Sequence, residues 1–179
     1  MLNKLIHFQE TIVVDKEYYT WQDIEHMTNV IINALIKDNF KPDYIVGLTR
    51  GGLVPATIMS NQTGIPMQTL DVRFRDMSSD YDGPERNKKM KRNAFDRKKI
   101  LVIDDINDTG TTMAWIKSDW DLDTLESIDP FNDNVRFAAL IDNTASNFDI
   151  DYSAHEINKM EHNVWIVFPW EGEKHYGIA

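Results

Sequence analysis

Cysteine is absent from this 179-residue sequence, which excludes both a disulfide framework and a zinc site built on cysteine. No apolar run approaches the roughly 20 residues that a membrane-spanning helix needs. The first residues also lack the apolar stretch of a signal peptide, so we expect a cytoplasmic protein with no membrane partner. Net positive charge is lacking as well. The formal net charge is −10, which argues against general nucleic-acid binding.

What is present indicates an α/β domain. Apolar residues make up 42% and charged residues 27%, values usual for a globular chain, and the length suits one domain over residues 1–179. Thr20 is a candidate N-cap with Asp23 in the capping-box position, and apolar residues recur at helical spacing until Lys37. A weaker pattern predicts an N-terminal edge strand or hairpin within residues 1–19. The other expected elements are strands at 44–46, 67–72, 100–103 and 135–141, and helices at 53–62 and from Thr111. This alternation predicts a mainly parallel twisted sheet flanked by helices, with a small hood made of N- or C-terminal pieces.

The most informative stretch begins with Ile100 to Ile103, four aliphatic residues typical of a central parallel strand. Acids and then a hydroxyl-rich helix start follow it: Asp104, Asp105, Asp108, Thr109, Gly110, Thr111 and Thr112. The unpaired N–H groups and the dipole of a helix N-terminus attract anions, and ligands of open α/β sheets lie beyond the strands' carboxyl ends. Asp and Gly after a strand are also ordinary turn residues. The order of these features nevertheless favours a site for a ligand with a phosphate, hydroxyls and a bridging metal ion.

A second loop follows the strand at 44–46 and contains Thr49, Arg50, Gly51 and Gly52. Arginine offers a planar fork of donors to phosphate, and adjacent glycines let the backbone come close to a ligand. A glycine-rich turn with a solvated arginine is the alternative.

Together these motifs resemble those of the type I phosphoribosyltransferases, which use phosphoribosyl pyrophosphate (PRPP). The resemblance implies that Asp104 and Asp105 hold the ribose hydroxyls and help to place Mg²⁺, with Asp105 as the metal ligand. It implies that Asp108 is the catalytic residue near the reacting carbon and the incoming base, where it accepts a proton from the base or orients it, and that residues 109–112 cradle the 5′-phosphate. Arg50 and Gly51 would lie in the pyrophosphate loop, which in this family often has a non-proline cis peptide, here before Arg50.

Two charged segments lie outside these motifs. Residues 86–99 hold eight basic residues and one acid, which favours a lid over the site within about 73–99, although a solvated charge run is the commoner explanation of such stretches. In the resembled family a flexible lid at this place closes over PRPP. Residues 118–134 hold six acids and no base, interleaved with apolar residues. We expect an amphipathic surface insertion that contributes to a subunit interface, and a metal site is the less favoured alternative.

The tail segment 163–171 is an apolar strand that runs into Phe-Pro-Trp-Glu. It resembles the base-binding tail of bacterial xanthine-guanine and related 6-oxopurine phosphoribosyltransferases. By that match Trp165 stacks on the purine and Ile166 supplies main-chain contacts. A buried core tryptophan is the alternative.

One departure from that subfamily leaves the base open. Those enzymes carry a lysine at the end of the strand equivalent to 135–141, where it pairs with the 6-oxo group of the purine. Asp142 or Asn143 stands there in this chain, and no lysine occurs between Lys117 and Lys159. Recognition of a 6-oxo group would then need Asn143, the backbone or water.

The resemblance implies Mg²⁺-dependent transfer of the phosphoribosyl group from PRPP to a purine base (guanine, xanthine or hypoxanthine), giving a nucleoside monophosphate and pyrophosphate. PRPP and a nucleobase are the expected partners, in a homo-oligomer that is a dimer or a tetramer. Two alternatives stay open. One is the same chemistry on another base, such as orotate or adenine. The other is a non-catalytic regulator of the same fold that senses PRPP or nucleotides and binds nucleic acid.

Overall fold

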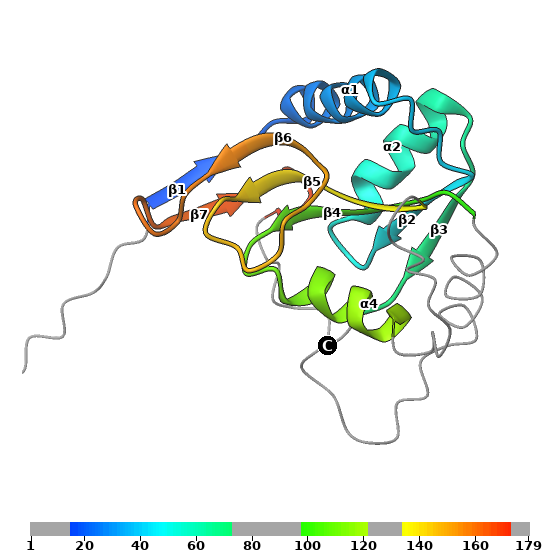
Figure 1. Ribbon diagram of the computed structural model, residues 1–179. Coiled ribbons are helices and arrows are strands. Elements are labelled where there is room, and N and C mark those ends of the chain that lie inside the picture. Colours follow the sequence, from blue (N-terminus) through cyan, green and yellow to red (C-terminus); the bar gives the residue numbers. More distant parts are fainter. Residues whose placement is uncertain (1–14, 73–97, 122–133, 173–179) are drawn as a thin grey trace, which may run out of the picture.

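Five parallel strands form the main sheet of the computed structural model, which describes residues 15–72, 98–121 and 134–172 (Figure 1). From edge to edge they are β3 (Met67–Leu70), β2 (Tyr44–Leu48), β4 (Ile100–Asn107), β5 (Val135–Asn143) and β6 (Tyr152–Ile157). The chain moves outward from β2 to β3 and then returns to β4 on the other side of β2. This reversal places a topological switch point at the carboxyl ends of β2 and β4, where open α/β sheets bind their ligands.

Helices cover both faces of this sheet, which confirms the predicted fold class. The helices α1 (Trp21–Lys37) and α2 (Leu53–Thr63) pack on one face, and α4 (Thr111–Asp121) packs on the other (Figure 1). Successive side chains of β4 serve the two layers in turn: Leu101 and Ile103 join the core under α1 and α2, whereas Val102 joins the core over α4. None of these helices is both long enough and apolar enough to cross a bilayer, within the described residues.

The predicted N-terminus of α1 is confirmed in detail. The Thr20 backbone N–H donates to Asp23 Oδ2 at 2.7 Å, and the Asp23 N–H donates to Thr20 Oγ1 at 3.3 Å. These reciprocal bonds satisfy donors that the first helical turn leaves without partners.

The hood is a two-stranded parallel sheet made from both ends of the described chain. In it β1 (Asp15–Tyr18) pairs with β7 (Val164–Val167), and the Tyr19 N–H donates to the Val167 carbonyl at 3.0 Å. The expected N-terminal strand is therefore present from residue 15, but it pairs in the hood and not at the edge of the main sheet. Figure 1 shows the hood beyond the ends toward which β5 and β6 point.

Three expectations need correction. First, β4 does not end at Ile103, because its ladder with β5 continues as far as the pair Asn107 and Asp142, so two of the acids lie inside the strand. Second, β6 was not expected at all. Third, residues 118–121 are the last turn of α4, where Trp120 is 1% exposed and belongs to the core, so no surface insertion begins there. Residues 122–133, and residues 73–97 of the lid expected within about 73–99, lie outside the described residues.

Candidate active site

The loop between β2 and α2 is anchored to the end of β3. The Thr49 N–H donates to the Leu70 carbonyl at 3.0 Å, and Thr49 Oγ1 donates to Asp71 Oδ1 at 2.8 Å. The peptide bond between Thr49 and Arg50 is cis, as the resemblance implied. The Arg50 side chain is exposed, and among the described residues it pairs with no carboxylate.

Gly51 and Gly52 are needed because β4 occupies the space where their side chains would be. A Cβ at Gly51 would overlap the Asp105 carboxylate, and a Cβ at Gly52 would overlap the Ile103 carbonyl. The two glycines therefore let the backbone of this loop pack closely against β4, with Gly51 next to the Asp105 carboxylate. The contact brings the β2–α2 loop and the acids of β4 to the same end of the sheet.

Asp104 and Asp105 form a tight acidic pair at this end. The Asp105 N–H donates to Asp104 Oδ1 at 3.0 Å, and the Ile106 N–H donates to Asp105 Oδ1 at 2.9 Å. Burial, followed by the negative charge of Asp105, raises the pKa of Asp104 well above its ordinary value. Burial also raises the pKa of Asp105. A bound cation would offset the repulsion between these two carboxylates.

This pair suits a magnesium ion better than a fully protein-made metal centre. Among the described residues no group of three or more His, Cys, Asp or Glu side chains is arranged to hold a metal. Mg²⁺ usually takes only one or two carboxylates and completes its octahedron with water and substrate phosphates. The donor set offered by Asp104 and Asp105 therefore fits this ion.

A tight turn precedes α4 at the place where the sequence predicts an anion site. Gly110 has φ of +80°, and a Cβ there would meet Phe148 and Ser146 at 2.7 Å, so glycine is required for both reasons. The exposed Thr109 and Thr111 hydroxyls lie 2.9 Å apart, and the Thr111 N–H donates to Thr109 Oγ1 at 3.4 Å. This long bond is weak, so a phosphate oxygen could replace it at low cost.

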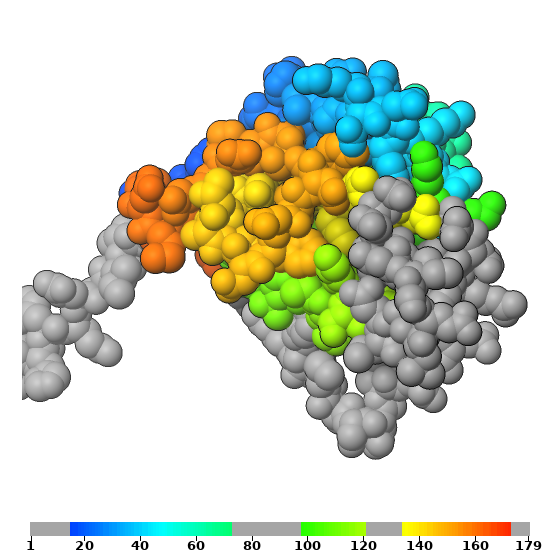
Figure 2. Space-filling model, viewed as in Figure 1, coloured from blue at the N-terminus to red at the C-terminus, as the bar shows by residue number. Residues whose placement is uncertain are grey.

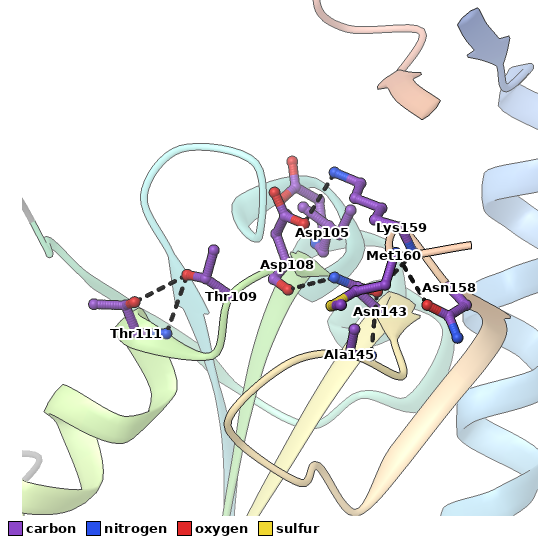
Figure 3. Close-up of polar contacts among 10 residues, drawn as sticks. Asp105, Asp108, Thr109, Thr111, Asn143, Ala145, Asn158, Lys159 and Met160 are labelled. Atoms are coloured by element: carbon purple, nitrogen blue, oxygen red, sulfur yellow. Dashed lines mark hydrogen bonds and ion pairs between the residues drawn. The ribbon is translucent and has the colours of Figure 1, made fainter. Parts of the chain in front are cut away.

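Asp108 lies between this turn and a residue that the sequence analysis missed. Lys159 Nζ lies 2.9 Å from Asp108 Oδ1, with side-chain exposures of 18% for the lysine and 46% for the aspartate. Figure 3 shows Thr109 and Thr111 on one side of Asp108 and Lys159 on the other. The turn between β6 and β7 thus brings a cation to Asp108, the predicted catalytic residue. The sequence held one signal of it, since Lys159 is the first lysine after Lys117 and comes six residues before Trp165.

Asn143 joins the two loops that carry this pair. Its Nδ2 donates to the Asp108 carbonyl at 2.8 Å, and its Oδ1 accepts from the Lys159 N–H at 3.0 Å and the Ala145 N–H at 3.3 Å (Figure 3). The side chain is 6% exposed. Both polar atoms are engaged inside the protein, so of the three options for recognising a 6-oxo group (Asn143, the backbone or water) this geometry does not favour the Asn143 side chain.

The hood contributes an exposed aromatic residue. Trp165 on β7 is 58% exposed, whereas its neighbour Ile166 is 6% exposed, as alternation along a strand requires. The alternative of a buried core tryptophan is therefore wrong. In the space-filling view the β6–β7 turn lies beside the connection between β5 and β6, at the margin of the molecule (Figure 2). The indole face is free to stack on a planar ligand.

Comparisons with known proteins agree on one family. The model of the "Phosphoribosyl transferase domain" family matches residues 15–174. Xanthine-guanine phosphoribosyltransferase of Desulfotalea psychrophila is 26% identical over 163 residues, which cover 88% of this chain and 87% of that protein. Xanthine phosphoribosyltransferase 1 of Saccharomyces cerevisiae is 24% identical over 132 residues, which are 63% of each protein.

A solved structure shows the same fold. The purine phosphoribosyltransferase from Pyrococcus horikoshii superposes with a TM-score of 0.62 at 24% identity, over 93% of this chain and 98% of that one. The family match covers every described strand and helix, and the resemblance noted in the sequence is confirmed. This chain therefore belongs to the phosphoribosyl transferase domain family.

Proposed function

We propose that this protein transfers the phosphoribosyl group from PRPP to guanine, xanthine or hypoxanthine. The observation that carries the proposal is the convergence of three elements at the switch point of the sheet. The acids of β4, the helix N-terminus after them and the cis-peptide loop after β2 all meet there. One of the two relatives is named a xanthine phosphoribosyltransferase and the other a xanthine-guanine phosphoribosyltransferase. These names support a purine as the acceptor.

Each part of PRPP has a matching set of groups in this arrangement. The first-turn N–H groups and hydroxyls of residues 109–112 suit the 5′-phosphate. Asp104 and Asp105 suit the ribose hydroxyls, because carboxylates accept hydrogen bonds from them. The exposed Arg50 guanidinium and the Gly51 backbone suit the pyrophosphate.

Asp105 would also bind Mg²⁺ as a ligand, and Asp104 would help to place the ion. When bound there, Mg²⁺ offsets the negative charge of the leaving pyrophosphate. The carboxylates themselves stabilise the positive charge that develops on the sugar as the bond to pyrophosphate breaks.

The base would enter on the side of Asp108 and the hood. Trp165 stacks on its ring, and the backbone of Ile166 contacts its edge. A ring nitrogen forms the new bond to the sugar carbon while the bond to pyrophosphate breaks, and Asp108 takes the proton that the base loses or orients the ring that carries it. Positioning and electrostatics therefore supply the catalysis.

A panel of radiolabelled bases tests the proposal directly. Purified protein with PRPP and Mg²⁺ should convert guanine, xanthine or hypoxanthine to the monophosphate, and should convert adenine and orotate far more slowly. Turnover of orotate alone, or of no base, would reject the proposed substrate class.

The substitution Asp108→Asn tests the proposed role of Asp108 as proton acceptor. The variant should bind PRPP with about the same affinity but lose turnover by roughly 10²–10⁴-fold, because the amide cannot take a proton. PRPP binding is measured by calorimetry and turnover by release of pyrophosphate. Unchanged turnover would remove Asp108 from the mechanism.

A further inference from the structure

The ion pair between Lys159 and Asp108 offers a base two opposite hydrogen-bonding groups at one place. Lys159 Nζ is a donor with no acceptor capacity, and an ionised Asp108 is an acceptor with no donor. The two are 2.9 Å apart, and the carboxylate is the more exposed of the pair. A ligand edge that carries a carbonyl oxygen next to a ring N–H would satisfy both groups simultaneously.

The geometry holds Lys159 in this position through its own backbone. Its N–H donates to Asn143 Oδ1 at 3.0 Å, and the same asparagine holds the Asp108 carbonyl through Nδ2 at 2.8 Å. Asn158 closes the turn from the other side, since its Oδ1 accepts from the Met160 N–H at 3.0 Å. The turn is closed further by the bond from the His162 N–H to the Asn158 carbonyl at 2.9 Å. A lysine whose backbone is fixed in this turn and whose Nζ is already paired with Asp108 loses little further conformational freedom when it binds a ligand.

Lys159 precedes Trp165 by six residues in the chain. Lys159 and Trp165 belong to one connection, in which the β6–β7 turn runs directly into the hood strand. Asp108 follows β4 directly and meets the lysine in the ion pair. A planar base whose edge meets this ion pair would contact both charged groups at once.

We propose that Lys159, from the β6–β7 turn, donates to the carbonyl oxygen of the base and selects 6-oxopurines, in place of the lysine that is missing at the end of β5. The inference rests on the proposed function and names the residue that sets its substrate class. A 6-oxopurine offers its oxygen to Lys159 and the adjoining ring N–H to Asp108. Adenine places an amino group opposite the ammonium, so two donors face each other and the site rejects it.

The variant Lys159→Met tests this assignment, because methionine keeps much of the aliphatic stem and removes the charge. Its kcat/KM for hypoxanthine should fall about 10- to 100-fold, the range expected for a lost hydrogen bond to a charged group. The KM for PRPP should stay within about 2-fold, and the ratio of hypoxanthine to adenine turnover should fall. Lys159→Arg keeps a donor and should retain more hypoxanthine activity than Lys159→Met.

The matched control is Lys41→Met, an exposed lysine between α1 and β2 at the amino end of the sheet, which should behave as wild type. Binding of GMP and AMP to the same variants, measured by calorimetry, supplies a readout that does not depend on turnover. Lys159→Met should weaken GMP binding more than AMP binding.

The two levels of the proposal fail in different ways. If wild-type protein turns over hypoxanthine and Lys159→Met keeps its kcat/KM and GMP affinity within about 2-fold, the role of Lys159 is wrong and the proposed function stands. An equal loss for GMP and AMP, or for PRPP, also overturns the selective role. If wild-type protein transfers to no purine, the proposed function itself is wrong.

Discussion

The substitution Asn143→Ala should destabilise the fold, because one side chain connects three backbone segments. It removes hydrogen bonds of 2.8 Å to the Asp108 carbonyl, 3.0 Å from the Lys159 N–H and 3.3 Å from the Ala145 N–H. Two strong bonds at about 0.5–1.5 kcal/mol each, with partial rehydration of the groups left behind, give a loss of about 2 kcal/mol. For a chain of this length that loss lowers Tm by about 4–8 °C.

Thermal unfolding and urea denaturation measure this effect, and Asn147→Ala is the control. Asn147 is exposed and lies in the same connection between β5 and β6, so its truncation should change the free energy of unfolding by no more than about 0.5 kcal/mol. If Asn143→Ala is as stable as this control, the asparagine does not join the loops as described.

Two further changes probe the phosphate side of the site. Gly51→Ala should lower kcat/KM for PRPP by about 100-fold with the fold retained, because the new Cβ displaces the Asp105 carboxylate; an unchanged kcat/KM for PRPP would refute this. Asp104→Asn should abolish most activity yet stabilise the protein by about 0.5–2 kcal/mol at neutral pH. The reason is that burial and the Asp105 charge raise the pKa of Asp104 in the folded state. The protonated Asp104 carboxyl therefore contributes its full stabilisation below the unfolded-state pKa of about 3.9, and this stabilisation is lost as the pH rises through the folded-state pKa. Unfolding in EDTA from pH 4 to 8 should therefore show the gain growing with pH, and a gain independent of pH would contradict the assignment.

The phosphate side of the site could be predicted from sequence because its signals are local. The aliphatic run at Ile100–Ile103, the acids and the helix start are contiguous, and the fold places them where their order indicated. Arg50 and the glycines likewise follow their strand directly. Local order was enough because each motif is a strand end joined to a helix start.

The side of the site proposed for the base, with Lys159 and Trp165, could not be predicted in the same way, because it is assembled by pairing between distant segments. The strand β6 has a largely polar sequence at a sheet edge, so periodicity did not reveal it. Without β6, the place of Lys159 just beyond a parallel strand was hidden. The length of β4 was missed for a related reason, since its last residues are held by the ladder with β5 and not by apolar burial.

The pairing of β1 with β7 has a consequence for how the protein matures during translation. Residues 15–18 leave the ribosome early, but their partners at 164–167 are among the last described residues to emerge. The described strands and helices that carry the proposed phosphate-binding residues are complete by residue 121, well before the strand β7 that carries Trp165. A nascent chain halted before β7 would carry the groups proposed to bind the sugar phosphate and would lack the tryptophan proposed to stack on the acceptor base.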